Sequence, residues 1–426
     1  MSAFGALTPR RIRQLWYAPV LAMATALMML RLFALARLLD VLDFAQLSAA
    51  LLVSSTFVML ACLGLQALLQ RDMPVMFVRG RERAARVLLT QSVLAAYACA
   101  VVGLVLAFAS PCDFGSPTLL VALGLVHGLS QQLFLVASVE SRSRGEPLRY
   151  AFQSLIRSVL IVGAGLLTAA MSRSALAVVG AEAAMSLLLA HGLLWQTVAG
   201  TRPRVAGLLR VAWRRMPRLE WHAALVLLVV SLVGFALTYA DRWLAALLLG
   251  AGEFGNYAFA GTVLAIGLSA QSLINASVYP LLARLYARDG TAACYALCRR
   301  LSLLALAGSL VLAPPAYFLL EAGLRRWYPA YDIAQGLLAP FLLVACFRVS
   351  DFWSSFMMIT GFQNRLLRTS IVAGGIAAML WGVVTQPWRP DGRTPGQLAM
   401  LAVALAVVGY AVAALASRRS ALEASA

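Results

Sequence analysis

Residues 221–280 read WHAALVLLVVSLVGFALTYADRWLAALLLGAGEFGNYAFAGTVLAIGLSAQSLINASVYP. Two long apolar runs, 221–248 and 256–280, lie on either side of the short turn LGAGEFG. A helix rises about 1.5 Å per residue, so about 20 apolar residues cross the roughly 30 Å hydrocarbon core of a membrane. The runs lack the polar–apolar alternation of a barrel strand. This stretch therefore predicts a pair of transmembrane α-helices.

The rest of the chain has the same character. Of its 426 residues, 62% are hydrophobic and 12% are charged, and the mean hydropathy is +0.83. Soluble domains are about half apolar and about a quarter charged, so this composition excludes a soluble globular protein. We expect an all-α integral membrane protein of about twelve transmembrane helices, at 14–36, 44–68, 87–109, 118–139, 150–171, 175–197, 221–248, 256–280, 299–320, 335–358, 369–386 and 397–416.

The basic residues predict the topology. All 35 are arginine, and with the 17 acidic residues they give the net charge of +18. Most lie in the segments that are inner if the N-terminus is inside, whereas the outer segments hold only Arg37, Arg173, Arg325, Arg326, Arg389 and Arg393. This bias predicts a multi-pass protein of the bacterial inner membrane with both termini in the cytoplasm. Because the arginines are explained by topology, nucleic acid is not an expected partner.

The N-terminus resembles a signal peptide, because Arg10, Arg11 and Arg13 precede an apolar run. We interpret the run as an uncleaved first helix, since Arg31 interrupts it and equally long runs follow.

The two halves of the chain resemble each other at an offset of 210 residues. Residues 38–50, LLDVLDFAQLSAA, align without a gap to 248–260, LLGAGEFGNYAFA, and Gly80 then falls on Gly290. Chance similarity between apolar sequences is the alternative. The alignment predicts two pseudo-symmetric six-helix bundles, at 1–197 and 221–426, related by an axis along the membrane normal.

The basic connector 198–220 joins the two predicted bundles. Its Leu208, Val211 and Trp213 lie among arginines. This pattern is compatible either with an amphipathic helix on the anionic inner leaflet or with a plain basic linker.

The stretch 239–286 carries a family pattern. Its elements are an Asp-Arg pair, a Leu-Gly pair, a Phe-Gly pair with a following aromatic residue, and a proline near the end of the next helix: Asp241-Arg242, Leu249-Gly250, Phe254-Gly255, Tyr257 and Pro280. With these features the chain resembles the Wzx-type polysaccharide and O-antigen flippases of the multidrug/oligosaccharidyl-lipid/polysaccharide exporter superfamily. The first half departs from the pattern, because Leu39-Asp40 replaces Leu-Gly and Ala45 replaces the second glycine.

The resemblance implies a V-shaped pair of six-helix bundles that works by alternating access. It implies a flippase that moves undecaprenyl-diphosphate-linked oligosaccharide to the outer leaflet for surface polysaccharide biosynthesis. The implied partners are the lipid-linked glycan and membrane lipids, with a polysaccharide polymerase and export machinery beyond them.

Polar groups inside the predicted spans are the candidate substrate-binding residues, because ionisable groups in hydrocarbon usually face the protein interior. They are Arg157, Arg348, Arg31, Arg242, Gln131, Gln271 and Asn275. Arginine suits a diphosphate, since its planar fork stays charged and grips phosphate oxygens in pairs. Alternatively, these arginines extend to the interface or lock helices through ion pairs. Arg348 and Asp351 are three residues apart, which allows a same-face pair.

Coupling to an ion requires a group that changes charge or binds a cation. The candidates are Asp241, Asp351 and Glu182, with Glu140 at an inner edge. His127 and His191 lie on apolar helices and are interpreted as packing residues, with proton relay as the alternative. The six cysteines form no CxxC pair and no histidine clusters with them, so no metal or other cofactor is expected.

Two other functions remain open from the sequence. The first is a cation-coupled small-molecule or multidrug exporter of the same superfamily, whose cavity is expected to be acidic or aromatic. The second is a membrane polysaccharide polymerase or ligase, which needs a sizeable outer loop with catalytic groups. The short predicted outer loops and the lack of a nucleotide motif favour a non-enzymatic transporter.

Overall fold

The computed structural model describes residues 16–109, 117–199, 205–385 and 394–424. The N-terminal arginines, Cys112, Arg389 and Arg393 lie outside these residues. The described residues are helical without a strand, and eleven of their helices are long and apolar enough to cross a membrane. The prediction of an all-α multi-pass membrane protein is therefore confirmed. The chain divides into two compact units, Met1–Val229 and Val230–Ala426.

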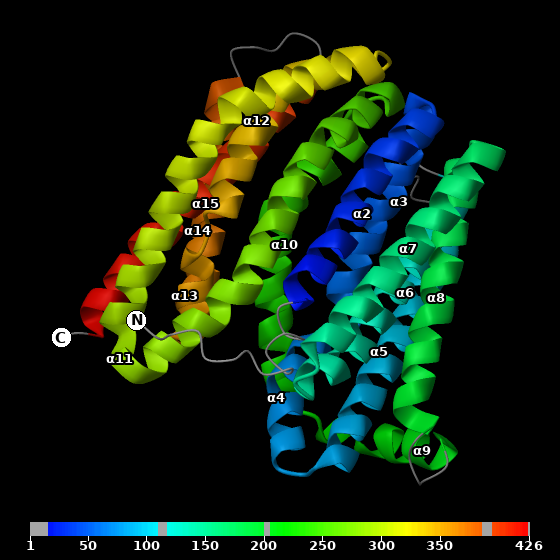
Figure 1. Ribbon diagram of the computed structural model, residues 1–426, viewed down its shortest axis with the longest axis vertical. Coiled ribbons are helices and arrows are strands. Elements are labelled where there is room, and N and C mark those ends of the chain that lie inside the picture. Colours follow the sequence, from blue (N-terminus) through cyan, green and yellow to red (C-terminus); the bar gives the residue numbers. More distant parts are fainter. Residues whose placement is uncertain (1–15, 110–116, 200–204, 386–393, 425–426) are drawn as a thin grey trace, which may run out of the picture. The chain divides into compact units, whose positions relative to one another are not determined.

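Unit 1 is a bundle of long helices followed by a short basic helix (Figure 1). Its elements are α2 (Tyr17–Leu38), α3 (Val41–Leu60), α4 (Leu65–Val78), α5 (Glu82–Ala109), α6 (Thr118–Ser143), α7 (Pro147–Ser172), α8 (Ala175–Ala199), α9 (Val205–Arg215) and the 3₁₀ turn η1 (Met216–Arg218). Helix α6 packs against α3 and α8, and α2 packs against α7. These contacts set the surroundings of the buried charges described below.

Unit 2 contains the second set of helices. They are α10 (Trp221–Leu248), α11 (Ala251–Trp327), α12 (Asp332–Val349), α13 (Trp353–Ile359), α14 (Gln363–Thr385) and α15 (Pro395–Glu423). The first turns of α10 group with unit 1, because the division falls after Val229. Helix α12 packs against α11 and α15, and α15 also packs against α14.

The predicted helix 44–68 is wrong as one element, because it is divided into α3 and α4. Leu63 and Gly64 have left-handed φ angles of 48° and 82°, a conformation that only glycine adopts readily. A Cβ atom on Gly64 would lie 1.9 Å from the carbonyl oxygen of Ala224 in α10. The close approach of this carbonyl therefore requires glycine at the break.

The separate helices predicted at 256–280 and 299–320 are joined in α11, with a non-helical break at Gly290. Gly290 has a φ of 82°, and its predicted repeat partner Gly80 has a φ of 67°. Helix α3, which lies before α4 and Gly80, begins at Val41, and α11, which contains Gly290, begins at Ala251, so the offset of 210 seen in the sequence is preserved. The shared starts and shared left-handed glycines support the internal repeat.

The predicted helix 335–358 is also divided, into α12 and α13. Asp351 lies at the break, where its carboxylate accepts hydrogen bonds from the backbone N–H of Ser354 at 3.4 Å and from its hydroxyl at 2.9 Å. A side chain that bonds to nearby backbone competes with helix continuation. The predicted bundle limits 1–197 and 221–426 stay a prediction, while the observed units place α9 and the start of α10 with unit 1.

Candidate functional site

Buried charges gather in unit 1 around one ion pair. Arg31 of α2 donates from Nη1 to Glu182 Oε2 of α8 at 2.6 Å. Arg31 is 4% exposed and Glu182 is fully buried. The other carboxylate oxygen, Oε1, lies against Gly165 of α7, where an added Cβ would approach it to 2.4 Å. Glycine at this position therefore leaves the space that the Glu182 carboxylate occupies.

A histidine joins this pair from α6. A Cβ on Gly124 or Gly128 would lie 2.8 Å from a carbonyl oxygen of α3, so the two glycines allow α3 and α6 to approach closely. The approach brings the Ser54 hydroxyl to 2.9 Å from Nδ1 of the buried His127. His127 Nε2 lies 3.7 Å from Glu182 Oε2, and Gln131 Nε2 lies 3.4 Å from His127 Nδ1.

Arg157 of α7 is the second guanidinium of the cluster. Its Nε donates to the Ser186 hydroxyl at 3.3 Å, and its Cζ lies 4.8 Å from the centre of the Phe134 ring. In the part of the chain that the structure describes, no ion pair includes Arg157, and its Nη2 has no hydrogen-bond partner. It interacts electrostatically with Arg31 and Glu182. We refer to Arg31, His127, Arg157 and Glu182 as the unit 1 cluster.

The unit 1 cluster carries one more positive than negative charge when His127 is neutral. A buried cation without a counter-ion is costly, so it is expected to have a partner during function. A guanidinium with free N–H groups suits a phosphate or carboxylate. The arrangement can therefore bind an anionic group. The Glu182 carboxylate would compete with that anion for the Arg31 guanidinium.

Unit 2 contains a different set of charges, which are matched in number. Asp241 of α10 is 1% exposed and accepts a hydrogen bond from the Tyr257 hydroxyl at 2.7 Å. The neighbouring Arg242 donates from Nη2 to the Gly261 carbonyl at 3.0 Å and lies over the Tyr239 ring. Both contacts join α10 to α11, and no ion pair of the described residues includes Asp241 or Arg242.

Arg348 and Asp351 line a common cavity of about 80 Å³ in unit 2, together with Ser354, Thr369, Ser370 and Tyr410. The allowed same-face pair does not form, since the described ion pairs do not include these two residues. Arg348 Nη2 instead donates to the Leu237 carbonyl at 2.9 Å. The break between α12 and α13 turns Asp351 toward Ser354.

Two predicted polar residues of α11 lie against the same break. Gln271 donates to the backbone carbonyl of Asp351 at 3.2 Å, and Asn275 accepts from the Ser355 hydroxyl at 3.4 Å.

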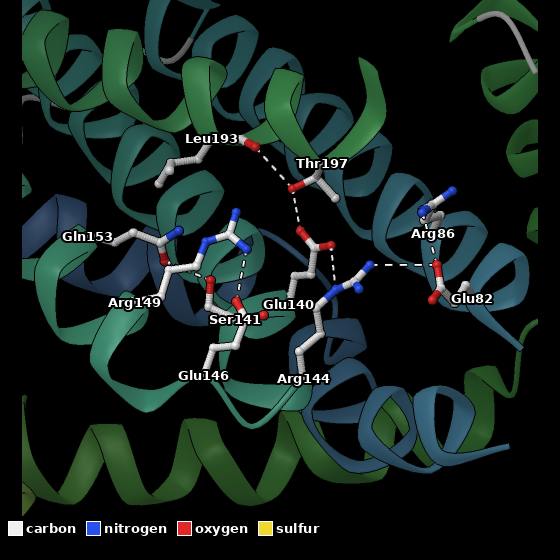
Figure 2. Close-up of polar contacts among 10 residues, drawn as sticks. All are labelled: Glu82, Arg86, Glu140, Ser141, Arg144, Glu146, Arg149, Gln153, Leu193 and Thr197. Atoms are coloured by element: carbon white, nitrogen blue, oxygen red, sulfur yellow. Dashed lines mark hydrogen bonds and ion pairs between the residues drawn. The ribbon is translucent and has the colours of Figure 1, made fainter. Parts of the chain in front are cut away.

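Glu140 belongs to a separate network that joins α5, α6 and α8 (Figure 2). Thr197 donates to one carboxylate oxygen at 2.6 Å and Arg144 donates to the other at 3.0 Å. Arg144 also lies 3.7 Å from Glu82, which pairs with Arg86. Because both oxygens of Glu140 are satisfied, its observed role is to hold these helices together.

The structure thus distributes the predicted site residues between the two units. Arg31, Gln131, Arg157 and Glu182 meet in unit 1, whereas Arg242, Arg348, Gln271, Asn275, Asp241 and Asp351 lie in unit 2. Sequence reasoning missed Ser54 and Gly165, and it interpreted His127 as a packing residue. The spacing of Gly124 and Gly128 about His127 was the available signal, because small residues four apart mark a close helix contact.

Comparison with known proteins shows the fold. Neither a family model nor a curated protein matches the sequence. The structure is similar to that of the Vibrio cholerae MATE transporter VcmN in the bent form, with a TM-score of 0.58 and 14% identity over 97% of this chain and 98% of that one. It is also similar to the lipid II flippase MurJ in an inward closed conformation, with a TM-score of 0.60 and 10% identity over 96% and 90%.

A multidrug resistance MATE family transporter of the MOP superfamily, in an inward-facing conformation, gives a TM-score of 0.59 at 12% identity over 96% and 95%. The chain has the fold that these transporters share.

Proposed function

We propose that this protein is a flippase for undecaprenyl-diphosphate-linked oligosaccharide in the bacterial inner membrane, working by alternating access in surface polysaccharide biosynthesis. The observation that carries the proposal is Arg157, a guanidinium inside a membrane bundle that pairs with no carboxylate of the described residues. A diphosphate supplies the negative charge that this group lacks, and it accepts several N–H donors at once.

Arg31 fits the same function as a second cation, for which Glu182 and the diphosphate would compete. Its ion pair with Glu182 balances its charge when no substrate is bound, while its Nε has no hydrogen-bond partner among the described residues. An incoming diphosphate would draw Arg31 and Arg157 to the same anion, and Glu182 would then need a proton or a cation. This exchange connects the substrate with a coupling ion through one carboxylate, with His127 as the adjacent proton carrier.

The polar groups of unit 2 support recognition of the glycan. The cavity with Arg348 and Asp351 carries the hydroxyls of Ser354, Thr369, Ser370 and Tyr410. Arg242, Gln271 and Asn275 add donors and acceptors suited to sugar hydroxyls. Because the four buried charges of this unit are balanced, we assign it a role in binding neutral parts of the substrate.

A small-molecule exporter is the second candidate. Two of the similar structures reported above are MATE transporters, one described as a multidrug resistance protein. The buried acid Glu182 could hold a cationic drug. The excess of guanidinium over carboxylate in the unit 1 cluster disfavours such a substrate, because a cation would be repelled by Arg31 and Arg157.

The test is a deletion in the source bacterium, followed by location of the undecaprenyl-diphosphate-linked glycan. We expect glycan trapped on the cytoplasmic leaflet and loss of surface polysaccharide. Normal polysaccharide together with new drug sensitivity would replace the proposal with the exporter. Glycan that reaches the outer leaflet but is not extended would indicate an enzyme.

A further inference from the structure

Helix α9 divides its apolar residues between two faces. One face packs on α5, where Leu208 and Ala212 are buried against Val87, with Leu94 and Val211 beside them. Gln91 of α5 fixes this contact by donating to the Ala212 carbonyl at 3.2 Å. The helix is therefore attached to unit 1 at the Glu82 end of α5, and Figure 1 shows α9 at the end of that bundle.

The second apolar face of α9 is uncovered. Val205, Leu209 and Trp213 are 37%, 41% and 68% exposed. They follow each other at intervals of four residues, so they form one stripe beside that of Leu208 and Ala212. Packing on α5 thus uses only part of the apolar surface of α9. An exposed tryptophan and leucine on a fixed helix are costly in water and favourable at a membrane interface.

The arginines beside the stripe indicate which kind of surface it can bind. Arg210 and Arg214 are exposed and one turn apart, and they lie next to Leu209 and Trp213 along the chain. Arg215 and Arg218 are also exposed, and residues 205–219 contain no acidic residue. Cationic charge beside an apolar stripe matches lipid with an anionic headgroup.

The position of α9 fits the same partner. It contacts α5 at residues 87–94, within the first turns of a helix apolar enough to cross the membrane. The arginine distribution predicts that this end faces the cytoplasm, where the leaflet is anionic. The apolar stripe can then reach the acyl boundary while the arginines stay among the headgroups.

We propose that α9 is an interfacial helix that binds anionic phospholipid of the cytoplasmic leaflet through the Val205–Leu209–Trp213 stripe and the guanidinium groups of Arg210 and Arg214. The inference goes beyond transport, and it holds for whichever substrate the protein carries. The turn after α9 is joined to the start of α10, because the Met216 carbonyl accepts a hydrogen bond from Trp221 Nε1 at 3.0 Å.

The test uses the full chain in nanodiscs titrated with acyl-brominated phosphatidylglycerol or with acyl-brominated phosphatidylcholine over the same range of mole fractions. The emission of Trp213 is isolated by subtracting that of the Trp213→Phe variant. We expect bromine to quench it, and to do so at a much lower mole fraction of phosphatidylglycerol. Each arginine near an anionic surface contributes about 1 kcal/mol, or about fivefold in affinity, so Arg210→Gln/Arg214→Gln should reduce the preference roughly 25-fold.

A matched control is Arg418→Gln/Arg419→Gln, which removes two exposed adjacent arginines from α15 and should leave the quenching of Trp213 unchanged. Trp213 emission that neither lipid quenches would overturn the proposal, because the stripe would then be covered by protein or by water. Equal quenching by both lipids, or no effect of the double α9 variant, would overturn the anionic selectivity. All variants change exposed side chains, so loss of folding does not obscure the result.

Discussion

The two units bury a similar set of charged residues but partner them differently. In unit 1, Arg31 and Arg157 share the single acid Glu182. In unit 2, Arg242 and Arg348 donate to the backbone carbonyls of Gly261 and Leu237, and the acids Asp241 and Asp351 have hydroxyl donors of their own. Unit 1 therefore has one more cation than anion around an ion pair that can exchange, whereas the four buried charges of unit 2 are equal in number and each has a hydrogen bond to a hydroxyl or a carbonyl.

This difference shows that the backbone of a repeat can be preserved while the polar contacts of its two halves differ. The helix starts and the left-handed glycines agree across the repeat. At the offset of 210, however, Arg31 corresponds to Asp241, an acid. One half thus holds an ion pair with an additional guanidinium, and the other holds charges bonded to hydroxyls and backbone carbonyls.

The largest expected effect is loss of export on replacing Arg157 by alanine. The cluster then lacks its unpaired guanidinium, so one cation fewer is present to bind a diphosphate. We expect export to fall below detection in a complementation assay for surface polysaccharide, with normal membrane insertion on immunoblots. Arg288→Ala, at an exposed residue of α11, is the matched control. Full export by Arg157→Ala would remove the distinction between the units on which the proposed function depends.

The comparison also predicts the effect of Arg348→Ala in unit 2. We expect export to be lost here too, because the guanidinium lines the cavity assigned to the glycan. The defect should differ from that of Arg157→Ala in its dependence on the glycan. A test with repeat units of different sugar composition should change the residual export of Arg348→Ala more than that of Arg157→Ala. The same dependence in both variants would show that the two units do not divide recognition in this way.

A second expected effect concerns the stability of the buried ion pair. Glu182→Gln leaves Arg31 and Arg157 without a counter-ion, and breaking a buried pair costs about 3–5 kcal/mol. Asp241→Asn weakens a hydrogen bond from Tyr257, and we expect about 1–3 kcal/mol. Unfolding in detergent measures both. Equal losses of stability would indicate that the two units stabilise their buried charges to the same extent. Restored stability on adding Arg31→Gln to the Glu182→Gln variant would confirm that the broken Arg31–Glu182 pair causes the loss.

Gly165→Ala is expected to have a moderate effect in unit 1. The new Cβ would meet Glu182 Oε1 at 2.4 Å, and overpacking of this kind costs about 1–3 kcal/mol. Gly163→Ala in the same helix is the matched control, because nothing lies within 4 Å of its Cβ. There the higher helix propensity of alanine should stabilise the protein by up to about 1 kcal/mol. Similar melting temperatures for the two variants would contradict the observed close contact between Gly165 and the Glu182 carboxylate.

The smallest effect is expected from Gly374→Ala in unit 2. Its Cβ would approach Leu237 Cδ2 to 2.9 Å, which is the end of a flexible side chain, so the cost should stay below about 1 kcal/mol. Gly375→Ala, with nothing within 4 Å, is the control. A loss larger than that of Gly165→Ala would show that the carbonyl contact of Arg348 with Leu237 is the more rigid of the two sites.

Much of the architecture could be predicted from the sequence. The length of the apolar runs predicts the spans, because a helix must satisfy its own backbone in lipid. The repeat at 38–50 and 248–260 predicts the shared helix starts. The breaks at Gly64 and Asp351 could not be predicted, because each has a contact from a distant helix: the Ala224 carbonyl at Gly64, and the Gln271 amide that donates to the Asp351 carbonyl.

The sequence by itself determined that this is a helical multi-pass membrane protein with charges inside its spans, because hydropathy and arginine placement are local properties of the chain. Only the tertiary structure decided which of those charges meet. Arg31 and Glu182 are separated by 151 residues, and α2 and α8 bring them within 2.6 Å. Arg348 and Asp351 are only three positions apart, yet they have different partners on either side of a helix break. Pairing depends on which helix faces pack together, and that is a property of the whole bundle.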